Sequence, residues 1–445
     1  MADNEKIVIG MVLFQGWELL DSQGPFTLLL KMAAASPDPS RYQFTTIADS
    51  TFNPQETTSH QPLVAEHTFA SCPPLSVLIL PGGIGTFLSS GDAALLAFLR
   101  EQHANPRMQW LCSVCTGSSV FAAARILDDR HATSNKAIFD VMARYGGGKV
   151  HWEREARFIV DGNVVTASGV SAGVDMAFEV GREVFGESVV ERIKREVKYV
   201  PLSHGEDPFA KILPPSNEWG AFRTSIFLHA LAPVIVHSAS NQAASPGLPF
   251  FRKQPRNILT VLLFPHFDAL DVACVQESLV RLSSTYRFEL VAVLPAESRN
   301  AIQVGGDSAA STGASHLREV LRVACDRLVD AETVMEEVFP WTKVEGAGRP
   351  IVFIPGVGQN SRASLDGKVG RKIWDAVKLA SFKQSADGNV CFLGCGDEVC
   401  QALEQATGVT RSSAQMKGWE RVENTWFAIT GMKGSHSICA VEFLI

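Results

Sequence analysis

The stretch "QWLCSVCTGSSVFAAARIL", Gln109 to Leu127, places a cysteine at the corner between two expected elements. The apolar run from Trp110 to Val114 predicts a short buried strand, and the composition of Ser119 to Leu127 predicts a helix. Cys115 then lies on the elbow, where the first free N–H groups of the helix carry partial positive charge. This position favours a thiolate. The alternative is a structural cysteine that packs as a small hydrophobic residue.

On both sides of this elbow the first half of the chain alternates strand-like and helix-like segments. This order predicts a parallel sheet with helices on both faces, complete by about residue 212. Further along, "RFIVDGNVVTASG" predicts a hairpin with its turn at Asp161 and Gly162, and residues 173–200 predict a long amphipathic helical region.

The pattern restarts after a Pro- and Ser-rich passage. "ILTVLLFPHFDALDVACVQESLV" aligns with "IVIGMVLFQGWELLDSQGPFTLL", which places Asp271 on Asp21, and a later match places Cys395 on Cys115. Val357 replaces the second glycine of "PGG" in this copy. We therefore expect two tandem doubly wound α/β domains: a catalytic domain over 1–212, a linker over 213–256, and a degenerate, C-terminally shortened domain over 257–445.

Composition narrows the function classes. The 445 residues carry a formal net charge of −7, which argues against nucleic acid or an anionic membrane as the main partner. "MADNEKIVIG" lacks the features of a signal peptide, so we expect a cytoplasmic protein. The apolar stretch Ser225–Ala239 is short for a membrane span. Cys391, Cys395 and Cys400 lack the spacing of a structural zinc site, and we expect no metal.

Chemistry-bearing residues follow three of the expected strands. In an open parallel sheet such residues gather at the carboxyl edge, so Asp21, Gly83 and Cys115 are expected to share one pocket. Cys115 is the candidate nucleophile, Asp21 the proton donor or acceptor, and free N–H groups of Gly83 and Thr116 would face developing negative charge. The alternatives are a helix N-cap for Asp21 and a simple strand-ending turn for "PGG".

The motifs "LLDSQGP", "LPGG", "SVCTGS" and "DGNVVTASGVSAGVDMAFEVGREVFGE", in this order, resemble the ThiJ/PfpI superfamily and its isonitrile hydratase branch. The resemblance implies a flavodoxin-like fold of the class I glutamine amidotransferase type, often dimeric. It matches the reactive cysteine to Cys115, the acid to Asp21 and a following threonine to Thr116. Beyond residue 256 the resemblance is weak.

The activity implied by this resemblance is the addition of water to an isonitrile, which gives an N-substituted formamide through a thioimidate on Cys115. Asp21 would remain protonated beside the thiolate and supply the proton. Neither a metal nor an organic cofactor is required. Some fungal relatives accompany isonitrile-making pathways, which implies a role in secondary metabolism or detoxification. A homodimer, or an intrachain pseudo-dimer of the two halves, is the expected assembly.

One departure and several alternatives remain open. Asn135, in "ATSNKAIF", stands where related proteins often carry a histidine, and this affects the expected substrate more than the reactivity of the cysteine. His204 and Glu206 would suit an amidase or peptidase triad. A glyoxalase or deglycase would use the same cysteine. The non-enzymatic alternatives are a thiol redox sensor and a regulator related to AraC-type proteins.

Overall fold

The central strand of the first half, β1 (Ile7–Val12), is buried along its whole length in a computed structural model of the chain. An unbroken buried run is typical of a parallel strand covered by helices on both faces. β1 pairs in parallel with β2 (Tyr42–Ala48) on one side and with β6 (Val77–Leu80) on the other. The winding therefore reverses between β1 and β6, and such a reversal opens a crevice at the carboxyl ends of the strands.

The structure describes two sets of residues. The first set is 6–50, 55–56, 62–197, 199–205, 207–208 and 210. The second set is 257–264, 272–273, 286–294, 322–323, 327–330, 351–355, 366–387, 391–394, 397–407 and 427–430.

The sheet of the first unit has seven strands in the order β10-β11-β7-β6-β1-β2-β5. Its remaining members are β5 (His67–Thr68), β7 (Trp110–Val114), β10 (Phe158–Asp161) and β11 (Val164–Ala167). β10 runs antiparallel to β11, and the other pairs are parallel. The mostly parallel α/β fold expected from the sequence is therefore confirmed. The hairpin is also present, but its turn is Gly162–Asn163, one residue later than predicted.

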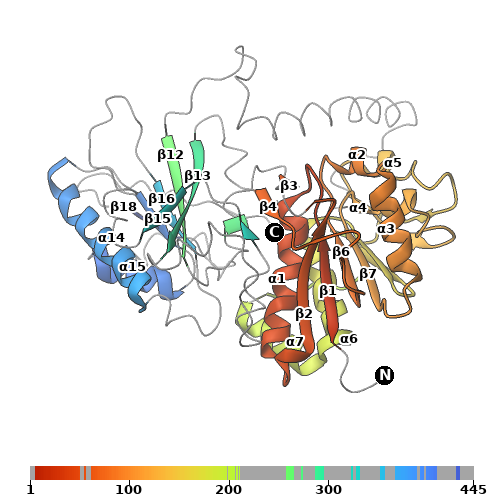
Figure 1. Ribbon diagram of the computed structural model, residues 1–445, viewed down its shortest axis with the longest axis horizontal. Coiled ribbons are helices and arrows are strands. Elements are labelled where there is room, and N and C mark those ends of the chain that lie inside the picture. The colour runs from red at the N-terminus through yellow and green to blue at the C-terminus, as the bar shows by residue number, and fades with distance from the viewer. Residues whose placement is uncertain are drawn as a thin grey trace, which may run out of the picture. The chain divides into compact units, whose positions relative to one another are not determined.

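Helices cover the two faces of this sheet (Figure 1). α1 (Leu19–Ala35) packs with α6 (Val170–Phe185) and α7 (Glu187–Val197), while α3 (Ala93–Ala104) packs with α4 (Gly117–Ala123). The single helical region predicted over 173–200 is two helices. Gly186 separates them, because its φ of 88° is a left-handed conformation that ends α6 and favours glycine.

Shorter elements complete the first unit: η1 (Pro39–Arg41), α2 (Thr86–Ser89), α5 (Phe139–Met142), β3 (Gln55–Glu56), β4 (Pro62–Val64), β8 (His131–Ala132) and β9 (His151–Trp152). β8 pairs with β9 in parallel. β14 (Arg322–Val323), from the second half of the sequence, pairs with β4 and belongs to this unit.

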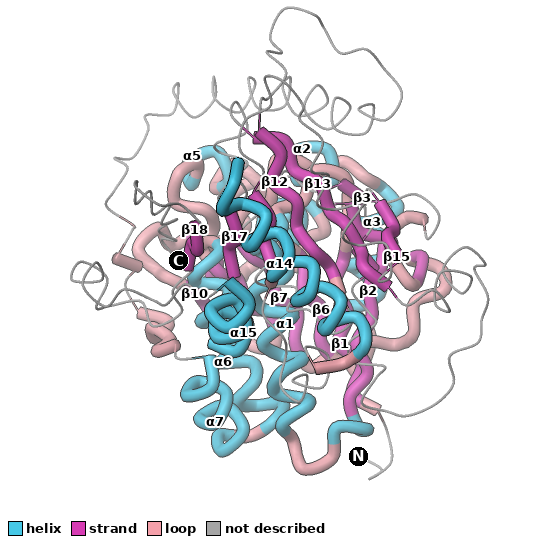
Figure 2. The backbone as a smooth tube through the Cα atoms, turned by 90° about the vertical axis from the view of Figure 1, so that its left-hand side faces the viewer, coloured by secondary structure: helices cyan, strands magenta, loops and turns pink. Residues whose placement is uncertain are grey.

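The second unit holds a six-stranded sheet in the order β15-β13-β12-β16-β17-β18. Its elements are β12 (Asn257–Leu263), β13 (Tyr286–Leu294), β15 (Arg327–Asp330), β16 (Ile351–Ile354), α14 (Lys368–Asp387), β17 (Cys391–Gly394), α15 (Asp397–Thr407) and β18 (Phe427–Thr430). α14 and α15 lie side by side (Figure 2) and share a core with the buried side chains of the strands. β18 is antiparallel to β17, and the other pairs are parallel.

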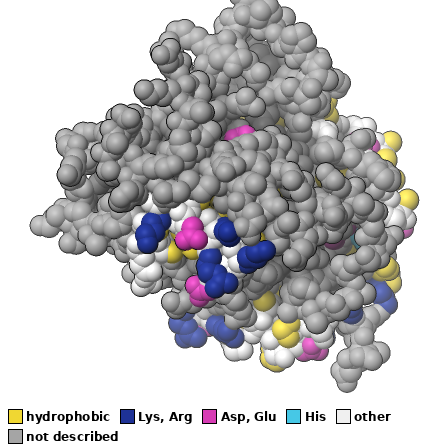
Figure 3. All heavy atoms as spheres, turned by 60° about the vertical axis from the view of Figure 1, so that its left-hand side comes forward, with side chains coloured by type: hydrophobic (Ala, Val, Ile, Leu, Met, Phe, Trp, Pro, Cys, Tyr) yellow, Lys and Arg dark blue, Asp and Glu magenta, His cyan; other side chains and the backbone are white. Residues whose placement is uncertain are grey.

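Several expectations fall beyond what the structure describes. Asp271, Val357, Cys395 and the stretch Ser225–Ala239 lie outside the described residues. The boundaries at 212 and 256, the two tandem domains and the degenerate repeat therefore stay predictions. Among the described helices, none has both the length and the apolar character required to cross a bilayer. On the face drawn in Figure 3, described Lys and Arg side chains stand among Asp and Glu side chains.

Candidate active site

Cys115 occupies the elbow predicted for it. β7 ends at Val114, α4 begins at Gly117, and the φ of 57° at Cys115 is a left-handed conformation that non-glycine residues rarely adopt. The backbone on both sides is fixed: the N–H of Cys115 donates to the Ala167 carbonyl at 2.9 Å, and its carbonyl accepts from the Ser134 hydroxyl at 3.1 Å. A nucleophile on a strained strand-to-helix turn is typical of cysteine and serine hydrolases.

Asp21 lies inside the first turn of α1, as the third residue of the helix. The N-cap position belongs to Glu18, so the alternative role of Asp21 as an N-cap is wrong. The Asp21 side chain is fully buried, and its Oδ2 accepts the N–H of Gly82 at 3.1 Å. Burial of a carboxyl group costs free energy unless it is hydrogen-bonded, and the Gly82 contact offsets part of that cost.

Gly82 is the point where the candidate residues meet. A Cβ atom at this position would lie 2.8 Å from Asp21 Oδ2, 2.8 Å from the Cys115 Cβ and 2.7 Å from the Thr116 nitrogen. Real Cβ atoms do not approach other atoms this closely, so the position requires glycine. The ends of β1, β6 and β7 thus bring the acid and the thiol to the same bare backbone.

Gly83 and Thr116 are present at the site, but one expected role is wrong. The N–H of Gly83 donates to Thr116 Oγ1 at 2.9 Å, and this hydroxyl donates to the Gly83 carbonyl at 3.2 Å. The Gly83 N–H is therefore not free to face developing negative charge. Thr116 instead locks the turn after β6, in which Gly83 adopts a φ of 119°. The backbone N–H of Thr116 hydrogen-bonds to the Cys115 thiol.

The electrostatic surroundings of Cys115 differ from the sequence prediction. Burial, the Asp21 carboxyl and the Glu18 carboxyl, in decreasing order, raise the pKa of the thiol well above its ordinary value. The helix N–H of Thr116 acts in the predicted direction but is outweighed. The predicted low thiol pKa is therefore wrong. Glu18 was missed, although its place three residues before Asp21 could have indicated a second carboxyl near the elbow.

Asn135 contacts the reacting sulfur. Its Nδ2 donates to Cys115 Sγ at 3.0 Å, which lowers the pKa of the thiol against the larger opposing effects. The sequence singled out Asn135 only as a departure from relatives. A contact between residues twenty positions apart could not be derived from their spacing.

Of the two residues of the alternative triad, the structure describes only His204. His204 is exposed, and its ring packs against Phe158 on the edge strand β10, with ring centroids 6.1 Å apart. Glu206 lies outside the described residues. The amidase triad therefore stays an untested alternative.

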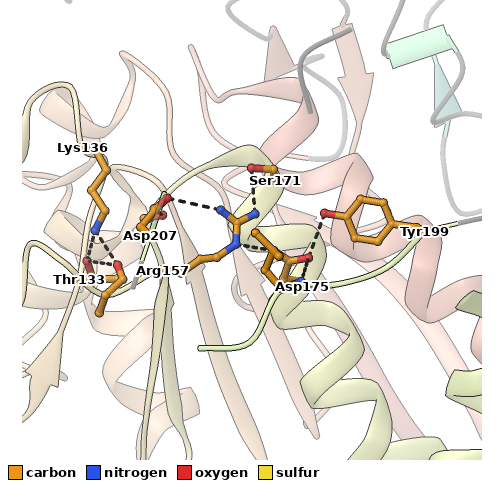
Figure 4. Close-up of polar contacts among 10 residues, drawn as sticks. Thr133, Lys136, Arg157, Ser171, Asp175, Tyr199 and Asp207 are labelled. Carbon is orange, nitrogen blue, oxygen red and sulfur yellow. Dashed lines mark hydrogen bonds and ion pairs between the residues drawn. The ribbon is translucent and has the colours of Figure 1, made fainter. Parts of the chain in front are cut away.

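A buried ionic cluster, which the sequence did not predict, lies around Arg157 (Figure 4). Arg157 is 3% exposed; its Nε donates to Asp175 at 2.5 Å, and its Nη1 lies 3.5 Å from Asp207. Tyr199 donates to the same Asp175 at 2.9 Å. These contacts tie the segment after α7 to helix α6 and to the start of β10.

The first half of the chain also matches known proteins. The model of the DJ-1/PfpI family matches residues 9–183. Isonitrile hydratase of Pseudomonas putida is 32% identical over 193 residues, which are 43% of this chain and 78% of that protein. The chain belongs to the DJ-1/PfpI family. The superfamily expected from the motifs is thereby confirmed.

Two further relatives illustrate the range of the family. The Parkinson disease protein 7 homolog of Danio rerio is 28% identical over 122 residues, which are 27% of this chain and 62% of that protein. The crystal structure of a ThiJ/PfpI family protein from Pseudomonas syringae is 27% identical and covers 54% of this chain and 91% of its own, with a TM-score of 0.39.

Proposed function

We propose that this DJ-1/PfpI protein is an isonitrile hydratase-like hydro-lyase, which adds water to R–N≡C and releases the formamide R–NH–CHO. One observation carries the proposal: the buried Asp21 carboxyl and the Cys115 side chain converge on the bare backbone of Gly82. The 32% identity to isonitrile hydratase supports the same reaction. Cys115, Asp21 and Thr116 are the proposed site residues, and Gly83 shapes the turn that Thr116 holds.

In the first step, the sulfur of Cys115 attacks the terminal carbon of the isonitrile. Because the raised pKa of Cys115 keeps the proton on sulfur at rest, Asp21 accepts this proton as the C–S bond forms. Asp21 then delivers it to the same carbon. The product is a thioimidate, Cys–S–CH=N–R, in which every atom of the thiol and the isonitrile is retained.

In the second step, water attacks the thioimidate carbon and one of its protons passes to nitrogen. The tetrahedral adduct Cys–S–CH(OH)–NH–R then collapses: the C–S bond breaks, its electron pair goes to sulfur, and the hydroxyl proton returns to the sulfur through Asp21. The formamide is released and the thiol is regenerated. These steps require neither an oxidant nor a reductant.

The direct test is incubation of the purified protein with simple alkyl and aryl isonitriles, with formamide followed by mass spectrometry. Cys115→Ser should abolish formamide formation. Cys72→Ser is the matched control, since Cys72 is also partly buried but its sulfur contacts the Pro73 carbonyl. Turnover that survives in Cys115→Ser would contradict the proposal. Conversion of a 2-oxoaldehyde by the same cysteine, without any formamide from isonitriles, would favour the glyoxalase alternative.

The cellular setting is part of the same proposal. We infer a cytoplasmic enzyme that acts on a small isonitrile in secondary metabolism or detoxification. We also infer assembly as a homodimer or as an intrachain pseudo-dimer. Light scattering distinguishes the two assemblies, because only the homodimer doubles the 48.2 kDa mass of the chain.

A further inference from the structure

The side-chain amide of Asn135 is oriented by contacts at both of its ends. Its Oδ1 accepts the backbone N–H of Ala137 at 3.0 Å, and its Nδ2 lies 3.0 Å from Cys115 Sγ. Because the oxygen is used by a backbone donor, the NH₂ group must be the end that faces the sulfur. An N–H donor, and not an oxygen lone pair, therefore points at the reacting atom.

The segment that carries Asn135 is itself anchored. Ser134 donates to the Cys115 carbonyl at 3.1 Å, and the N–H of Thr133 donates to Thr166 on β11 at 2.9 Å. On the other side of Asn135, the Lys136 amine donates to Thr133 Oγ1 at 2.8 Å and to the Ala156 carbonyl at 2.6 Å (Figure 4). The amide is thus held in place by the sheet and by the elbow.

The need for such a donor follows from the charges around the sulfur. The Asp21 and Glu18 carboxyls both disfavour negative charge on Cys115, and its partial burial leaves less water to solvate that charge. The hydrogen bonds that favour this charge come from Asn135 and the Thr116 backbone. A hydrogen bond to an ionised acceptor is stronger than one to a neutral acceptor, so the Asn135 contact strengthens as charge develops.

We propose that Asn135 is a further catalytic residue, whose amide orients the Cys115 sulfur and stabilises its negative charge when the sulfur attacks and again when the C–S bond breaks. This inference rests on Cys115 as the nucleophile of the proposed function, but not on an isonitrile as the substrate. The amide occupies the position where a histidine was expected, and it donates a hydrogen bond without exchanging a proton.

The test is the pH profile of Cys115 alkylation by iodoacetamide, read by mass spectrometry of the Cys115 peptide. Asn135→Ala should raise the apparent pKa of Cys115 by about one unit, which corresponds to about 1.4 kcal/mol. At neutral pH its alkylation rate should fall by about three- to tenfold, because the thiolate fraction drops while each thiolate becomes more nucleophilic. Asn135→Asp should raise the pKa further, since a carboxylate can keep the Ala137 contact but turns an oxygen lone pair toward the sulfur.

Asn105→Asp is the matched control. Asn105 makes the same local turn, with its Oδ1 accepting the N–H of Arg107 at 3.0 Å, but its amide donates to the Leu75 carbonyl. It should leave the Cys115 profile unchanged. Wild-type profiles in Asn135→Ala and Asn135→Asp, both folded by circular dichroism, would overturn the inference. If Asn135→Asp does not fold, Asn135→Ala alone decides.

The outcome is separable from that of the proposed function, because alkylation requires no isonitrile. A raised pKa in Asn135→Ala together with no formamide from the wild-type protein would leave the role of Asn135 intact and reject the hydratase reaction. Formamide formation by the wild-type protein, together with an unchanged Cys115 pKa in Asn135→Ala, would support the hydratase reaction and reject the role of Asn135.

Discussion

The partly buried Cys115 and the buried Asp21 lie against the same glycine, Gly82, and their proximity decides where the proton resides. The carboxyl groups and the burial keep the proton on sulfur at neutral pH, so the thiol is not activated by the helix end in the way that the sequence predicted. In the proposed mechanism, activation comes from proton transfer to Asp21 as the substrate arrives. The left-handed elbow and the Gly82 contact provide the geometry for that transfer.

Asp21→Asn should change alkylation and turnover in opposite directions. Removal of the negative charge lowers the pKa of Cys115, so iodoacetamide should react faster at neutral pH. An amide cannot carry a proton between sulfur and carbon, so formamide formation should be lost. The two measurements are made on the same folded sample, which rules out unfolding as the common cause. Full turnover in this variant would return Asp21 to a structural role.

Helix α6 and the segment that follows α7 are held together by the Arg157 cluster (Figure 4). Arg157 joins residue 175 of α6 to residue 207, beyond α7, and all three side chains are almost completely buried. Desolvation raises the pKa of Asp175 in spite of the opposing effect of Arg157. Removal of the arginine would leave two buried carboxyl groups without their shared cation.

Arg157→Met should therefore lower the free energy of unfolding by about 3–5 kcal/mol. Arg182→Met is a matched control, since Arg182 also bridges two carboxylates, Glu179 and Glu187, but on the surface. Its cost should be about 0–1 kcal/mol, because solvent screens exposed ion pairs. Urea denaturation measures both values. Equal losses of unfolding free energy in the two variants would show that the burial of the Arg157 cluster does not matter for stability.

The main strands of the first unit and their alternation with helices were predictable from the sequence, while the contacts at the strand ends were not. β7 runs from Trp110 to Val114 as predicted, because a short apolar run between a turn and a helix leaves little choice. The Asn135 amide and the Gly83 N–H found partners that depend on how loops after different strands pack. The same is true of Arg157 and Asp207, which lie fifty residues apart in the sequence.

The molecule as a whole joins one unit that matches a known family to a second that the family model does not reach. The strand sequence β13-β12-β16-β17 of the second sheet follows the scheme of β2-β1-β6-β7 in the first. By the predicted alignment, Val357 stands where the first unit has Gly83. At Gly83 a Cβ would lie 2.4 Å from the Gly16 carbonyl oxygen, so a valine could not adopt the same turn.

Cys395→Ser should accordingly leave the rate of formamide formation within about twofold of wild type. A substitution outside the active site usually changes free energies by no more than about 0.5 kcal/mol. The paired variant is Cys115→Ser, which should be inactive. Steady-state kinetics on both proteins gives the comparison. A large loss of turnover in a folded Cys395→Ser protein would show that the second unit takes part in the chemistry.

The left-handed backbone at Cys115 also bears on how this sequence can change over time. At a φ of 57°, cysteine is less stable than glycine or asparagine would be, by about 1–2 kcal/mol against glycine. The thiol at this position therefore carries a cost in stability. In lineages that no longer need its reactivity, we expect position 115 to change before the fold is lost.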